Sequence, residues 1–261
     1  NLAPLNLASP VKTDFTLADF DFDLPEALIA QHPTAVRSAS RLLDGRSTAP
    51  ADRGFADLPQ LLNAGDLLLF NDTKVVKARL FGEKASGGKL EMLIERVLPA
   101  STDSAPNREV VAHIKVSKKP SVGSVLNMAI GADGKPAFQA TLLGRWPDES
   151  GALFRFQLTD DAYDLMATHG HVPLPPYITH ADDATDLARY QTVFAKHPGA
   201  VAAPTAALHF DEGVLAALST RGIETAHITL HVGAGTSAPV KTDDLSAHKM
   251  HAERYHVPPE T

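Results

Sequence analysis

The sequence predicts an α/β body with a mixed sheet, interrupted by an inserted small all-β barrel domain. Helix and strand patterns come first, a run of short strands without a helical pattern follows, and helix and strand patterns then return. With 261 residues, the chain is long enough to build a core in each part. We expect residues 1–66 and 159–261 to form the catalytic body and residues 67–158 to form the barrel domain.

Apolar periodicity and the positions of proline and glycine place the elements of the body. Helical patterns stop at His32-Pro33, where proline restricts the preceding residue, and beside Gly65, Gly170 and Gly222. Helices are expected at residues 24–31, 55–63, 160–169, 187–196 and 212–221. A buried strand is expected at residues 66–70 and a second strand at residues 223–232.

The barrel is predicted from evenly spaced short strands separated by turn signals, of which Ser86-Gly87-Gly88 is typical of a hairpin. Because no helical pattern lies among these strands, we expect them to close on themselves. The expected strands are residues 74–83, 89–98, 109–116, 124–130, 137–143 and 151–158.

Charge is distributed unevenly along the chain. The net charge of −7 argues against a broad nucleic-acid surface. Residues 74–119 nevertheless contain ten basic and five acidic side chains and carry +5, so the remainder carries −12. This basic segment is consistent with local contacts to RNA phosphates and equally with a solvated barrel surface.

Composition excludes several classes of protein. The chain has no cysteine, which rules out disulfides and thiolate metal sites and permits a reducing compartment. No apolar run approaches the roughly 20 residues of a membrane helix, and residues 1–10 lack the basic start of a signal peptide. A Gly-x-Ser-x-Gly nucleophile motif is also missing. We therefore expect a cytoplasmic protein that is neither membrane-bound nor a serine hydrolase.

The twelve histidines raise the question of a metal site. His248, His251 and Glu253 are the best local candidates, but His-x-x-His is not the i,i+4 pair of a zinc helix. We expect no metal and instead favour acid–base chemistry by imidazoles near neutral pH.

The most informative stretch is residues 199–236, which contains a run of small residues, a helix and a strand that ends in glycines. In that strand Ile228, Leu230 and Val232 alternate with three polar side chains, and we expect the apolar face to be buried. The polar side chains are His227, Thr229 and His231. Glycines at the end of a strand can expose backbone N–H groups to a ligand, although they also form ordinary tight turns. His209 and His231 are the candidate acid–base residues, with hydrogen-bonded core histidines as the alternative.

Motifs along nearly the whole chain resemble one enzyme family, the S-adenosylmethionine:tRNA ribosyltransferase-isomerases of queuosine biosynthesis. The resemblance is most specific in GAVAAPTAALHF at residues 199–210 and TLHVGAGT at residues 229–236. The supporting motifs, in the order of the family, are DFDFDLP (19–25), RS (37–38), SRLL (40–43), GDLLLFNDT (65–73), ARLFG (78–82), GG (87–88), GHVPLPPYI (170–178), YQTVF (190–194) and HKMHAE (248–253).

The resemblance implies transfer and isomerisation of the ribosyl moiety of S-adenosylmethionine onto 7-aminomethyl-7-deazaguanine in tRNA. The products are epoxyqueuosine-tRNA, adenine and methionine. It implies S-adenosylmethionine as co-substrate, tRNA as partner, a monomer, and His209 and His231 as catalytic residues. The implied S-adenosylmethionine- or base-binding residues are Arg37, Arg41, Pro175, Tyr177, Tyr190, Gln191, Thr205, Gly233, Gly235 and Thr236. The implied tRNA-binding residues are Lys74, Lys77, Arg79 and Lys84.

The chain departs from the family pattern in three ways. Ala207 and Ser237 stand where the family usually has glycine and an aromatic residue. Family members also continue beyond the end of this chain, which implies that the C-terminal part of the body is missing here.

The alternatives to this function are a non-catalytic or truncated RNA-binding module and another S-adenosylmethionine-dependent RNA-modifying enzyme. A methyltransferase-like enzyme would need a strand–glycine loop–helix that the sequence does not show.

Overall fold

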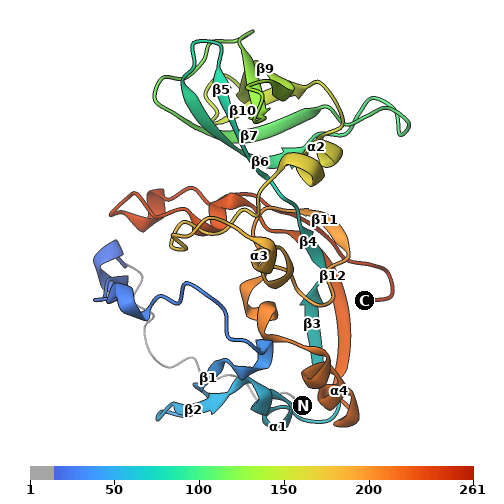
Figure 1. Ribbon diagram of the computed structural model, residues 1–261. Helices are drawn as coiled ribbons and strands as arrows, with labels where there is room; N and C mark the ends of the chain where they lie inside the picture. The colour runs from blue at the N-terminus through green and yellow to red at the C-terminus, as the bar shows by residue number, and fades with distance from the viewer. Residues whose placement is uncertain (1–14) are drawn as a thin grey trace.

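The computed structural model describes residues 15–261, and the fold consists of a β-barrel set on one end of an α/β body (Figure 1). Residues 1–10, where we expect no signal peptide, lie outside this range. Among the described residues, no helix is long and apolar enough to cross a membrane. The mixed-sheet body and the barrel confirm the predicted fold class.

Six strands of the described chain close into an antiparallel barrel in the order β10-β7-β6-β5-β8-β9. They are β5 (Arg79–Lys84), β6 (Lys89–Val97), β7 (Glu109–Val116), β8 (Val125–Ile130), β9 (Pro136–Trp146) and β10 (Leu153–Leu158). Alternate side chains fill the interior, and Leu80, Met92 and Phe156 are completely buried there. Gly87 supplies the positive φ of +88° that the β5–β6 turn requires.

Within residues 15–261, the body sheet has the order β13-β12-β3, and β11-β4 and β1-β2 form separate pairs. β3 runs parallel to β12 and β4 runs parallel to β11. The strands are β1 (Arg41–Asp44), β2 (Ala51–Gly54), β3 (Leu67–Asn71), β4 (Thr73–Val75), β11 (His197–Ala200), β12 (Glu224–His231) and β13 (Arg254–His256).

The expected barrel boundary at residue 67 is too early. β3 and β4 pair with strands of the body, so the barrel strands begin at Arg79 and the predicted strand 74–83 is split in two. The prediction that residues 66–70 are buried is also wrong in part. Phe70 is buried, but Leu67 and Leu69 are 55% and 53% exposed, because β3 packs one face against the body core and leaves the other open.

The α-helices of the described chain are α1 (Leu58–Leu61), α2 (Ala162–His169), α3 (Ala184–Arg189) and α4 (Glu212–Thr220). Asp211 caps α4 as predicted, because its side chain accepts the Val214 N–H. Short 3₁₀ turns complete the body: η1 (Leu17–Phe20), η2 (Glu26–Leu28), η3 (Arg37–Ala39), η4 (Phe55–Asp57), η5 (Thr205–His209), η6 (Ala234–Ser237) and η7 (Leu245–Ala247).

Two predicted helices are wrong. Residues 24–31 contain only the 3₁₀ turn η2, because Leu28 is 73% exposed and no buried apolar face stabilises a longer helix there. The helix expected at residues 187–196 instead starts at Ala184 and ends at Arg189. Its start is fixed by a reciprocal capping box between Asp183 and Asp186.

The two faces of β12 do not divide as expected, because side chains on both faces are half-buried and only Thr229 is fully buried among residues 227–232. Thr229 on the polar face is buried, whereas Ile228 and Leu230 are half-buried. Two side chains of the polar face have partners inside the body. Thr229 Oγ1 donates to the carboxylate of Asp72 at 2.6 Å, and His227 packs on Phe70. The buried hydroxyl of Thr229 is therefore satisfied by an internal hydrogen bond.

Candidate functional site

The main candidate for a ligand site is a cavity of about 360 Å³ in the body, which we call the tyrosine cavity. Its walls come from the loop before β1, the proline segment 174–178, α3 and η5. Six of the predicted site residues line it: Arg37, Pro175, Tyr177, Tyr190, Thr205 and His209. The volume is within the range of small-molecule sites, and its wall combines apolar side chains with a few polar groups.

His209 is held in a defined orientation in this cavity. Its Nδ1 lies 2.8 Å from Ser40 Oγ, and its ring packs on Phe55 with centroids 5.3 Å apart. Ser40 donates its hydroxyl hydrogen to the Arg37 carbonyl at 3.2 Å, so Ser40 Oγ accepts the Nδ1–H of His209. This tautomer leaves Nε2 with a free lone pair. Burial lowers the pKa of His209, so the neutral imidazole is favoured.

The two arginines that the sequence groups together have different environments. Arg37 lines the tyrosine cavity and donates to the carbonyls of Ala188, Arg189 and Leu208, so it ties α3 to η5. Arg41 lies outside the cavity and forms an ion pair with Asp52, and its side chain is 86% exposed. The structure therefore does not bring the two guanidinium groups together as a clamp.

The aromatic wall of the cavity is formed by Tyr177 and Tyr190. Tyr177 is half exposed, while burial raises the pKa of Tyr190 against the opposing effect of the Ala203 backbone. Gln191 lies outside the cavity. Its side-chain amide exchanges hydrogen bonds with the N–H and carbonyl of Val75, which fixes the chain after α3 to β4.

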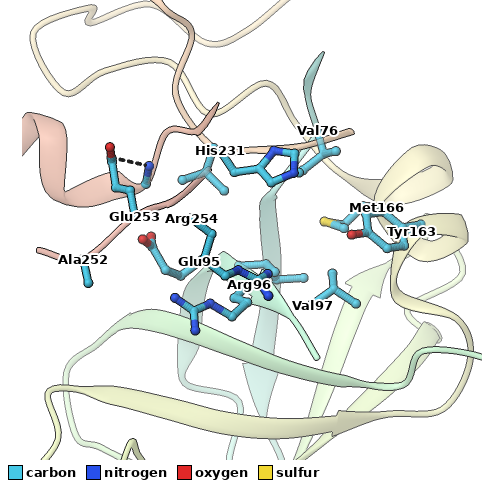
Figure 2. Close-up of a pocket in the computed structure, with 14 residues that line it drawn as sticks. Val76, Glu95, Arg96, Val97, Tyr163, Met166, His231, Ala252, Glu253 and Arg254 are labelled. Carbon is cyan, nitrogen blue, oxygen red and sulfur yellow. Dashed lines mark hydrogen bonds between the residues drawn. The ribbon is translucent and has the colours of Figure 1, made fainter. Parts of the chain in front are cut away.

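His231 lies in a second, smaller cavity of about 60 Å³ between the barrel and the body, which we call the junction cavity (Figure 2). The His231 ring, from the end of β12, faces Tyr163 and Met166 of α2, and Glu95 and Arg96 of β6 lie across from it (Figure 2). This volume holds a few water molecules and is too small for a nucleoside. The structure thus places His209 and His231 in different cavities.

The orientation of His231 is set by Thr73 and Gly199. Thr73 Oγ1 donates to the His197 carbonyl at 3.4 Å and lies 2.8 Å from His231 Nδ1, so it accepts the Nδ1–H. Gly199 packs directly against the ring. Burial, followed by repulsion from Arg254 and His197 and opposed by Asp72, lowers the pKa of His231.

The glycine loop after β12 is packed against other parts of the same chain. The N–H of Gly233 donates to Glu253 Oε1 at 2.9 Å, and the N–H of Ala234 donates to Glu95 Oε2 at 3.0 Å. A Cβ on Gly235 would lie 2.3 Å from the His251 ring. Thr236 is exposed. These glycines therefore allow close packing with carboxylates and an imidazole, and the two N–H groups are already paired.

The four predicted tRNA-binding residues are spread from β4 of the body to β5 of the barrel. Arg79 pairs with Glu91 at 2.9 Å and donates to the Leu174 carbonyl, while Lys84 donates to the Lys118 carbonyl. Lys74 is exposed and Lys77 is half-buried. Among residues 15–261, no group of three or more His, Asp or Glu side chains is arranged to hold a metal ion.

Three residues that sequence reasoning missed occupy these sites. Asp186 and Arg189 line the tyrosine cavity from α3, and Glu95 of the barrel reaches the glycine loop of the body. Burial opposes ionisation of Glu95, but its contacts with His113 and the Ala234 N–H, and the charge of His251, lower its pKa. The capping-box spacing of Asp183 and Asp186 was a readable signal for α3. The contact of Glu95 has no local sequence signal.

The fold and the tyrosine cavity define a class of α/β protein that carries an inserted barrel and a nucleoside-sized site in its body. A family model described as "Queuosine biosynthesis protein" matches residues 17–261. The chain belongs to the queuosine biosynthesis protein family.

Curated relatives support this assignment. Proteins named "S-adenosylmethionine:tRNA ribosyltransferase-isomerase" are 52% identical in Burkholderia pseudomallei (strain 1106a) and 50% identical in Herminiimonas arsenicoxydans. The alignments cover 93% and 95% of this chain, and the chain spans 64% and 67% of those relatives. The crystal structure of an S-adenosylmethionine tRNA ribosyltransferase from Thermotoga maritima is 25% identical, with a TM-score of 0.30, over 82% of this chain and 58% of that one.

Proposed function

We propose that this chain binds S-adenosylmethionine in the tyrosine cavity and transfers its ribosyl moiety, with isomerisation, to 7-aminomethyl-7-deazaguanine in tRNA. The observation that carries this proposal is the convergence of separate motifs on one cavity. Arg37, Pro175, Tyr177, Tyr190 and His209 come from four distant motifs that resemble the family, yet they line the same wall. The cavity volume of about 360 Å³ suits a nucleoside with an attached amino acid.

The chemistry requires a group that can accept and return a proton. The positive sulfonium acidifies the C5′ protons, so a positioned base can break a C5′–H bond and leave its electron pair on carbon as an ylide. His209 is neutral at pH 7 and carries its lone pair on Nε2, so it takes this proton and returns it to the departing adenine. The ylide electron pair forms a C4′–C5′ double bond and breaks the C4′–O4′ bond, and the O4′ electron pair forms the C1′ carbonyl as the bond to adenine breaks. The neutral aminomethyl nitrogen adds to C4′ and loses one proton, which returns the electron pair to C5′. C5′ then bonds to C1′, and the resulting alkoxide closes the epoxide at C5′ as methionine leaves with the electron pair of the C5′–S bond.

His231 has a separate place in this proposal. Its cavity adjoins the barrel, and its Nδ1–H is held by Thr73 in the same way that Ser40 holds His209. It is therefore the second acid–base candidate, on the side where the barrel approaches the body. We propose that tRNA is bound by basic residues on β4 of the body and at the start of the barrel, of which Lys74 on β4 is the most accessible. We further propose a cytoplasmic monomer.

The test is adenine release from S-adenosylmethionine in the presence of tRNA that carries 7-aminomethyl-7-deazaguanine. We expect His209→Ala to lower the rate by about 10²- to 10⁴-fold, the usual contribution of a general acid–base group. His231→Ala measures the contribution of the second acid–base candidate to the rate. The matched control is His256→Ala, because His256 on β13 is exposed. Near-normal release by His209→Ala would reject its role. tRNA binding by the wild-type chain without adenine release would favour the RNA-binding alternative.

A further inference from the structure

One helix presents two opposite charges to the tyrosine cavity. Asp186 and Arg189 lie three residues apart on α3, so their side chains share a face of the helix, and both line the cavity. Helix α3 lies between the chain segment that precedes β1 and the strands β3 and β12 of the body (Figure 1). Within the described residues, no ion pair of 4.0 Å or less joins the two side chains. Asp186 instead lies beside His180, whose Nδ1 is 3.7 Å from Asp186 Oδ2, so a ligand here would meet a carboxylate that already has one imidazole neighbour and a guanidinium that is not paired with it.

Asp186 is a buried carboxylate with one uncommitted oxygen. Its side chain is part of a residue only 7% exposed. Oδ2 accepts the Asp183 N–H at 3.0 Å and lies 3.7 Å from His180 Nδ1. In the part of the chain that the structure describes, no hydrogen bond reaches Oδ1. A carboxylate that lines the cavity with an oxygen free of hydrogen bonds favours a cationic hydrogen-bond donor there.

Arg189 has the complementary property. Its Nη1 donates to the Ala35 carbonyl at 3.4 Å, while its Nε is buried and has no hydrogen-bond partner among residues 15–261. Burial and then the nearby charge of Arg189 lower the pKa of Arg37, as expected for two guanidinium groups that repel each other across this wall, and Asp211 opposes this effect. An anion placed here would relieve that repulsion and could use the free donors of Arg189.

We propose that Asp186 and Arg189 form an α-amino-acid subsite, in which Asp186 binds the α-ammonium group and Arg189 binds the α-carboxylate of S-adenosylmethionine. A zwitterion holds its two charges on neighbouring atoms, which matches two opposite charges on one helix face. The apolar segment with Leu174, Pro175 and Ile178 lines the same cavity and contacts the methylene chain of the ligand. This inference rests on the proposed function, and it makes both residues determinants of specificity.

The experiment is calorimetric titration of the whole chain with three ligands. S-adenosylmethionine carries both charges, decarboxylated S-adenosylmethionine keeps the ammonium group, and methylthioadenosine has neither. Arg189→Gln should lower the affinity for S-adenosylmethionine about 10- to 100-fold and change the affinities for the other two ligands less than about twofold. Asp186→Asn keeps an oxygen for the helix cap. It should lower the affinity for both ammonium-bearing ligands by about tenfold or more and leave the affinity for methylthioadenosine unchanged.

Matched controls come from exposed positions on other helices. Asp164→Asn in the first turn of α2 and Arg221→Gln at the end of α4 should leave all three affinities unchanged. Arg189→Lys keeps the charge without the planar guanidinium and should retain an intermediate affinity for S-adenosylmethionine. Suppose that the wild-type chain binds S-adenosylmethionine, and that the Asp186 and Arg189 variants lower the affinity for all three ligands equally or change none of the affinities. The proposed subsite is then overturned, and the proposed function stands. If the wild-type chain does not bind S-adenosylmethionine, the proposed function itself fails.

Discussion

Gly199→Ala is the substitution that probes the orientation of His231 most directly. Gly199 has a φ of +151°, in a region that residues with a Cβ rarely adopt. A Cβ at this position would lie 2.8 Å from both Nδ1 and Cε1 of His231, which is closer than van der Waals contact allows. The alanine methyl must therefore displace the imidazole or the backbone of β11.

The expected cost has two parts. Forcing a residue with a Cβ into this backbone region costs about 1–3 kcal/mol. Displacing the ring also loses the 2.8 Å hydrogen bond between His231 and Thr73, which contributes about 1 kcal/mol. The free energy of unfolding should fall by about 2–4 kcal/mol. The control is Gly45→Ala, where a Cβ would meet nothing within 4 Å.

Urea unfolding measures the stability, and the imidazole nitrogen shifts of His231 report its tautomer. The double variant Gly199→Ala/His231→Ala removes the ring that the new methyl would strike, so the two substitutions should be less than additive. A Gly199→Ala variant as stable as Gly45→Ala, with unchanged His231 shifts, would refute this reasoning.

Three further predictions concern other contacts. Thr229→Val removes the 2.6 Å hydrogen bond to the buried Asp72 and should cost about 1–3 kcal/mol in urea unfolding; a neutral result would contradict this contribution. Because burial lowers the pKa of His209, its neutral form persists to lower pH than a free imidazole. The acid limb of adenine release should therefore lie below about pH 6.5, and a limb above that value would exclude His209 as the base. Lys74→Glu should lower the salt dependence of tRNA binding by about one unit of slope; an unchanged slope would remove Lys74 from the interface.

The local parts of the fold were predictable because their signals are local. Alternation and glycine turns predict the barrel strands, and Asp211 marks the start of α4. The pairing of β3 with β12 was not predictable in this way, since it joins segments far apart in the chain. The same limit applies to the buried Thr229 of β12, whose partner Asp72 lies in another segment.

The residues of the candidate site likewise include some with a local sequence signal and some without one. The motifs that resemble the family contain most of the residues around the tyrosine cavity. They also group His231 with His209, whereas the structure places these two residues in different cavities. Asp186 escaped notice because the helix that carries it was expected three residues too late, whereas Arg189 lay within the expected helix but was not assigned to the site. A helix start read from its capping box would have placed both on one face.

The central claim is that the tyrosine cavity, and not the junction cavity, holds S-adenosylmethionine. Hydrogen–deuterium exchange of this chain with and without S-adenosylmethionine tests it directly. We predict slower exchange in residues 174–178 and 205–209, with little change in the strand ends around Gly199 and His231. Protection confined to those strand ends and the glycine loop, with none in the tyrosine cavity, would contradict the account.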